Sequence, residues 1–99
     1  MIGLMYKKSI RSDECMLFDF NHDAEHGIWM KNMLFPIDVV WLDSKMRIIH
    51  IENRIQPCTK TFGCKTYNAG KNSRLVIEFR AGTAEKIRLK AGDALSYCN

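Results

Sequence analysis

Short apolar stretches separated by polar turns run along most of the chain, and they are rich in β-branched and aromatic residues. This pattern is typical of β-strands rather than of helices. The stretches predict strands over residues 15–20, 28–32, 37–43, 46–53, 75–79 and 94–98. A short polar connection joins the third strand to the fourth, which predicts a β-hairpin.

Successive side chains of a strand point to opposite faces of the sheet, so the pattern also indicates which faces of each strand are buried. The stretch 37–43 is apolar at both odd and even positions, and we therefore expect a central strand. In 75–79 the apolar side chains fall mainly on one face, which we expect to be buried, and Glu78 points the other way.

One helix is expected, over 84–89, with Thr83 as its N-cap and a turn at Gly92. The predicted fold is therefore mostly β (α+β): a small antiparallel barrel-like or rolled sheet with one short helix near the C-terminus. A chain of 99 residues has the size of a single domain, spanning 1–99.

The formal net charge of +4 is unevenly distributed. Residues 1–50 hold six Lys/Arg and seven Asp/Glu (net −1), whereas residues 51–99 hold nine and four (net +5). The irregular stretch 54–74 interleaves five cations with two aromatic residues: Arg54, Lys60, Lys65, Lys71 and Arg74 with Phe62 and Tyr67. Such a loop suits single-stranded nucleic acid, which is one alternative function.

The four cysteines, Cys15, Cys58, Cys64 and Cys98, include no C-x-x-C pair. Cys58 and Cys64 bracket a five-residue loop and could be a disulfide, two free thiols or metal ligands. A thiol-based redox or enzymatic role of Cys58 and Cys64, with His50 as base and Asp38 as its orienting group, is a second alternative function.

Other chemistry is less well supported by the pattern. His22 and His26 are four residues apart, but no apolar stripe supports a helix there, so we predict no metal site and no cofactor. A glycine-rich phosphate-binding loop is also missing from the sequence.

The stretch 28–32 places a lysine and an asparagine inside an apolar run. On a strand, Trp29 and Lys31 share one face and form an aromatic–cation pair suited to an anionic ligand. In a purely structural alternative, Lys31 lies along Trp29 and solubilises an edge, and Asn32 caps the turn before Pro36. We nevertheless predict a shallow site that binds a small or extended anionic partner rather than catalysing a reaction. Its predicted residues are Trp29, Lys31, Asn32, Asp38 and Tyr67, with Asp38 orienting the lysine.

Several blocks occur in one order: "GLMYKKSI", "CMLFDF", "WMKNMLFPIDVVWLD", "LVIEFRAGTAEK" and "LKAGDAL". Over nearly its whole length the chain resembles the prokaryotic family known as domain of unknown function 192. The resemblance implies a compact, mostly-β domain with short helices and no established activity. Its motif falls on Trp29, Met30, Lys31, Asn32, Pro36, Asp38, Pro57, Cys58, Cys64, Tyr67, Glu78, Gly82, Gly92 and Asp93.

Members of that family usually have a strand and a helical stretch before the position of Gly3, so this chain is expected to lack that N-terminal region. A missing strand would leave a sheet edge for a protein partner or for a second copy in a homodimer. The sequence shows neither a signal-peptide pattern nor an 18-residue apolar run. We therefore expect a cytoplasmic protein with no membrane partner, although related bacterial proteins often carry export signals.

Overall fold

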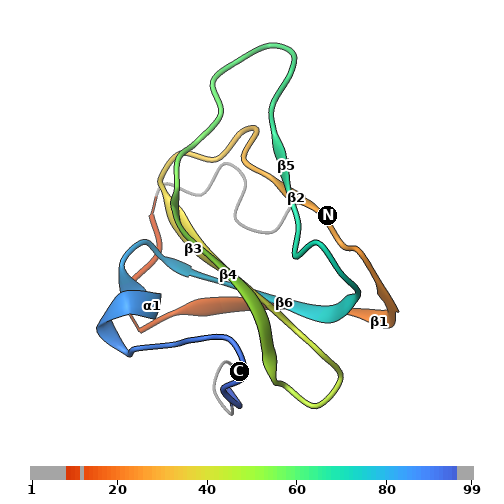
Figure 1. The fold of residues 1–99 in the computed structure, drawn as a ribbon. Helices are drawn as coiled ribbons and strands as arrows, with labels where there is room; N and C mark the ends of the chain where they lie inside the picture. Colours follow the sequence, from red (N-terminus) through yellow and green to blue (C-terminus); the bar gives the residue numbers. More distant parts are fainter. Residues whose placement is uncertain (1–8, 12, 96–99) are drawn as a thin grey trace.

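The computed structural model describes residues 9–11 and 13–95. Its main element is a four-stranded antiparallel sheet with the strand order β1-β6-β3-β4 (Figure 1). These strands are β1 (Cys15–Ala24), β6 (Ser73–Arg80), β3 (Ile37–Leu42) and β4 (Ile48–Ile55). A second sheet pairs β2 (Ile28–Trp29) with β5 (Thr66–Tyr67), and α1 spans Thr83–Lys86.

The predicted fold class is confirmed, because the described chain is mostly β and antiparallel with one short helix near its C-terminal end. The main sheet is not closed into a barrel: β1 and β4 are its two edges. The predicted homodimer through such an edge stays a prediction.

Two apolar clusters lie on opposite faces of the main sheet, and the central strand β3 contributes to both. Ile37, Val39 and Trp41 belong to the first cluster, with Val76 of β6. Val40 and Leu42 belong to the second cluster. All six residues of β3 are buried, which confirms the expected central strand.

Different segments cover the two faces. Ile28 of β2 and Tyr67 of β5 pack against the first cluster, so the small β2–β5 sheet covers that face. Leu89 and Leu95, which follow α1, pack on the second cluster. Covering both faces explains why Glu78, although it points away from Ile77 and Phe79, is also buried.

Several predicted element boundaries were wrong. β1 continues to Ala24 through a stretch expected to be a loop, because an irregularity after Asp19 lets Ala24 pair with Ser73. β4 runs over 48–55 instead of 46–53. The expected loop 54–74 contains β5 and the start of β6, whereas the expected strand 28–32 is reduced to β2.

The helix also differs from the prediction. α1 ends at Lys86, and its N-cap is Gly82 (φ 94°) with no side-chain hydrogen bond from the capping residue, so Thr83 is not the cap. The predicted strand 94–98 is represented by a single bridge between Arg47 and Ala94, and residues 96–98 lie outside the described range. No helix in the described part of the chain is long and apolar enough to cross a membrane.

Candidate functional site

Four of the five residues predicted to bind a ligand, all except Asp38, lie on a projection that rises from the main sheet (Figure 1). We call this projection the arm: β2, the turn at 30–33, and residues 56–67, which include β5. It joins the sheet through Met30, which is buried in the first cluster, and through Ile28 and Tyr67.

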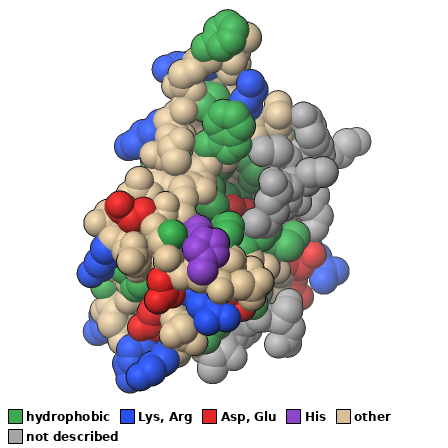
Figure 2. Space-filling view, turned by 90° about the vertical axis from the view of Figure 1, so that its right-hand side faces the viewer, with side chains coloured by type: hydrophobic (Ala, Val, Ile, Leu, Met, Phe, Trp, Pro, Cys, Tyr) green, Lys and Arg blue, Asp and Glu red, His purple; other side chains and the backbone are tan. Residues whose placement is uncertain are grey.

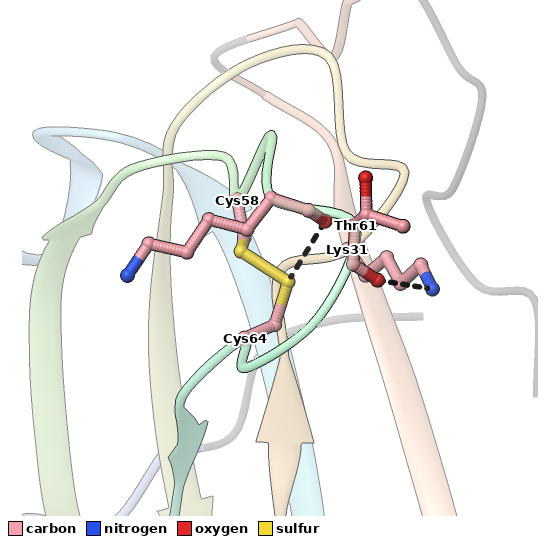
Figure 3. The surroundings of a disulfide bond; sticks show 5 residues. Lys31, Cys58, Thr61 and Cys64 are labelled. Carbon is pink, nitrogen blue, oxygen red and sulfur yellow. Dashed lines mark hydrogen bonds between the residues drawn. A yellow bond between two sulfur atoms is a disulfide. The ribbon is translucent and has the colours of Figure 1, made fainter.

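A disulfide between Cys58 and Cys64 closes the loop of the arm (Figure 3), with Cα atoms 5.9 Å apart. The sequence left open a disulfide, two free thiols or metal ligands, and this structure shows the disulfide. Closing so short a loop is worth about 2 kcal/mol on the loop-entropy model. Cys15 is disulfide-bonded as well, and Cys98 lies outside the described residues.

Asn32 has a backbone role. The Met33 N–H donates to the Met30 carbonyl at 3.2 Å, which closes a turn with Lys31 and Asn32 at its centre. Asn32 has φ 64°, a left-handed conformation that asparagine tolerates better than most residues. The Cys58 N–H donates to the same Met30 carbonyl at 3.0 Å and so ties the turn to the disulfide loop.

The ammonium of Lys31 links β2 to the same loop. Its Nζ donates to the Thr61 carbonyl at 3.4 Å (Figure 3) and lies 5.6 Å from the centroid of the Trp29 ring. Trp29 is 46% exposed. The expected aromatic–cation pair is therefore present on the outer surface of the arm.

Tyr67 lies on the opposite face of the β2–β5 sheet from Trp29. Ile28 pairs with Tyr67 and Trp29 with Thr66, and directly paired residues share a face. The Lys65 Nζ lies 4.7 Å from the centroid of the Tyr67 ring. A shallow depression of about 300 Å³ lies there, lined by Met30, Gln56, Pro57, Cys58, Thr59, Lys60, Gly63, Lys65 and Tyr67.

Asp38 does not orient Lys31. Its side chain is fully buried in β3, where Oδ1 accepts from the Arg54 N–H and Oδ2 from the Ala84 N–H, both at 2.8 Å. Arg54 has φ 53°, and Ala84 is in the first turn of α1, whose own N-cap supplies no side-chain oxygen. Asp38 thus holds the end of β4 against the start of α1. It is therefore not part of the candidate site.

The structure does not assemble the proposed thiol–histidine–carboxylate set. The Cys58 sulfur is bonded to Cys64, and His50 is hydrogen-bonded to Glu52 and lies beside Trp41. His22 and His26 each form a hydrogen bond between a ring nitrogen and a backbone carbonyl. Residues 9–11 and 13–95 contain no group of three His, Cys, Asp or Glu placed to hold a metal ion.

Positive charge on the arm is not neutralised locally. Residues 53–77 contain no Asp or Glu. The two arginines of this stretch have partners elsewhere: Arg54 Nε lies 3.1 Å from Glu85, and Arg74 Nε lies 3.2 Å from Asp19. The ion pairs between described residues include none for the three lysines of the arm, which are Lys31, Lys60 and Lys65.

The pKa of Asp19 is lowered by the hydrogen bond it accepts from the Asn21 N–H at 2.8 Å, and further by Arg74. This carboxylate therefore stays charged and remains available to Arg74 of β6, with which it pairs across the neighbouring strands β1 and β6.

The sequence analysis predicted neither the strong exposure of Phe62 nor the burial of Glu78. Phe62 is 86% exposed within the disulfide loop, although it had been counted among the aromatic residues of the basic stretch. Glu78 is 6% exposed, and burial raises the pKa of its carboxyl to about 7. A signal for the burial of Glu78 was available, because an apolar pattern on both faces of 37–43 implies that both faces of the neighbouring strand are covered.

Comparisons with known proteins give a family but no activity. The model of the DUF192 family, described as Uncharacterized ACR, matches residues 1–97. The UPF0127 protein TK1120 of Thermococcus kodakarensis is 26% identical over 95 residues, covering 96% of this chain and 56% of the relative. The chain thus spans little more than half the length of that curated relative.

Two solved structures share the fold. One, from Sinorhizobium meliloti 1021 and provisionally described as a transcription regulator, has a TM-score of 0.86 and 29% identity, covering 94% of this chain and 69% of its own. The other, a protein of unknown function from Novosphingobium aromaticivorans, has a TM-score of 0.85 and 24% identity, covering 97% and 66%. The second likeness concerns the fold alone.

Proposed function

The chain belongs to the DUF192 family, and from the geometry of its arm we propose that it binds an extended anionic ligand there. The observation that carries this proposal is the set Lys31, Lys60 and Lys65, which lie on one small projection and form none of the ion pairs between described residues. Lys60 and Lys65 also belong to the stretch 53–77, which contains no Asp or Glu. Clustered uncompensated cations attract anions and raise their rate of association.

The arm is braced before any ligand arrives. The disulfide closes its loop, the Met30 carbonyl holds the loop to the turn, and the Lys31 ammonium reaches the Thr61 carbonyl. A site that is already ordered loses less conformational entropy on binding, which favours affinity.

The shape favours an extended ligand over an enclosed one. Lys60 and Lys65 border a depression of about 300 Å³, whereas Lys31 and Trp29 lie on the other face of the small sheet. A compact molecule could not contact both faces, but a chain of anionic groups that wraps the edge of the arm could.

The test is binding of fluorescently labelled short-chain polyphosphate, measured by anisotropy at 50 and 200 mM salt. If each of the three lysines neutralises one charge, as in binding to a single-stranded polyanion, the affinity should fall roughly 20-fold over that salt range. The triple variant Lys31→Gln, Lys60→Gln and Lys65→Gln should lose binding and most of the salt dependence.

The matched control replaces three exposed cations away from the arm: Lys45→Gln, Lys86→Gln and Lys90→Gln. This control variant removes the same net charge as the first triple variant but leaves the lysines of the arm in place. It should therefore weaken binding far less. Equal losses in both triple variants would mean that net charge alone attracts the probe, and the proposal would then be wrong.

Single-stranded nucleic acid is the second candidate, supported by the exposed Phe62 within the basic stretch and by the description of the Sinorhizobium meliloti neighbour. The same titration with labelled oligothymidylate tests it. Clearly tighter binding than to polyphosphate of equal charge, lost in Phe62→Ser, would favour nucleic acid.

A further inference from the structure

We propose that the tip of the arm, Phe62 between Lys60 and Lys65, docks onto the surface of a lipid bilayer that contains anionic lipids. This inference rests on the proposed function, because the lysines that would bind an extended anion are the ones that would meet the headgroups. It adds a specific partner and a role for Phe62.

Phe62 is the first observation. It is 86% exposed, the most exposed of the large apolar side chains in the described chain, and a disulfide closes the loop that presents it. Figure 2 shows hydrophobic side chains at the tip of the molecule and again just below it, with Lys and Arg side chains on both sides. A loop closed by a disulfide thus presents an apolar ring to solvent.

The charges around the ring are the second observation. Lys60 lies two residues before Phe62 and Lys65 three residues after it, and Lys31 is held to the same loop through the Thr61 carbonyl. An anionic leaflet attracts each lysine near its surface, which corresponds to roughly 5-fold in affinity per residue. An exposed aromatic ring with lysines close to it in the same loop matches the apolar boundary of such a leaflet and its negative headgroups.

The other aromatic rings of the arm argue for a bilayer over nucleic acid. Binding of single strands uses several aromatic faces on which successive bases stack. Here the Lys31 ammonium lies near the Trp29 ring, and the Tyr67 ring packs on the core with the Lys65 ammonium over it. Of the three aromatic residues of the arm, only Phe62 presents a ring without a lysine over it.

The choice of cation points the same way. Arginine, with its planar fork of donors, is the preferred residue for nucleic-acid recognition. Arg54 and Arg74 are instead engaged with Glu85 and Asp19. The cations of the arm itself are lysines, whose compact charge needs no particular geometry at a fluid surface. The earlier expectation of no membrane partner rested on the lack of a spanning stretch, which surface docking does not require.

The experiment is vesicle flotation with two lipid compositions, phosphatidylcholine alone and phosphatidylcholine with 30% phosphatidylglycerol. The protein should float with the anionic vesicles and remain behind with the neutral ones. Phe62→Ser should weaken binding to anionic vesicles by ~10-fold while retaining wild-type affinity for polyphosphate. The Lys31/Lys60/Lys65 triple variant should lose both activities.

Ile87→Ser is the matched control, because Ile87 is 47% exposed but follows α1, away from the arm. It should bind vesicles like the wild type. Binding to polyphosphate without binding to anionic vesicles, or equal flotation of Phe62→Ser and the wild type, would overturn the docking proposal and leave the proposed function standing. Failure to bind either probe would overturn both.

Discussion

Replacing Glu78 by glutamine should stabilise the protein at pH 8 and have little effect at pH 4. Glu78 is in β6, one of the two inner strands of the main sheet, paired with Met16 on one side and Val39 on the other, and is 6% exposed. Removal from water disfavours its charged form, and this raises the pKa of its carboxyl from 4.5 to about 7.

The magnitude follows from the difference between the two pKa values. Well below pH 4.5 the carboxyl is protonated in both the folded and the unfolded chain, so pH has no effect on stability through this group. Between pH 4.5 and 7 the unfolded chain has lost the proton while the folded chain still holds it. The free energy of unfolding therefore falls by about 1.4 kcal/mol per pH unit, or roughly 3 kcal/mol in total.

Glutamine has nearly the same size and carries no charge at any of these pH values, so it should remove this loss. The assay is urea unfolding without reductant at pH 4, 6 and 8, followed by tryptophan fluorescence. Glu25→Gln is the control, since Glu25 is exposed. A difference between Glu78→Gln and the wild type that stays constant from pH 4 to 8 would refute the reasoning.

Two further predictions concern the polar residues of the sequence-predicted site. Asp38→Ala should lower the free energy of unfolding by about 2–4 kcal/mol, because it leaves the Arg54 and Ala84 N–H groups without their acceptor; a loss below about 0.5 kcal/mol in urea unfolding would contradict this role. Asn32→Gly should keep both stability and polyphosphate affinity, whereas Asn32→Val should cost about 1–2 kcal/mol at φ 64°. Loss of polyphosphate binding in the glycine variant would show that the amide contacts the ligand.

The β architecture could be predicted because it depends on local pattern. Apolar side chains at both odd and even positions of 37–42 are sufficient to indicate a strand covered on two faces, and β3 is such a strand. Boundaries were less predictable where long-range pairing decides them. The polar stretch 21–24 has no strand pattern of its own, yet it extends β1 because Ala24 pairs with Ser73.

The helix shows a similar limit. Thr83 has the side chain of an N-cap, but the N-cap is Gly82 with φ 94°, and the acceptor for the Ala84 N–H comes from Asp38, 46 residues earlier. A carboxylate on a distant strand can replace a local cap, and no local pattern reveals that it does so. The same contact removed Asp38 from the site in which the sequence had placed it.

The motif Trp29-Met30-Lys31-Asn32 illustrates why polar residues in an apolar run are ambiguous. Met30 anchors the turn in the core, and Asn32 supplies a backbone conformation that few residues accept. Neither role requires a ligand. Lys31 differs, because a hydrogen bond of 3.4 Å to an exposed carbonyl does not need a full charge and provides little net stability. If Lys31→Gln unfolds like the wild type while polyphosphate affinity falls, the charge at this position serves binding, and the neighbouring asparagine serves the fold.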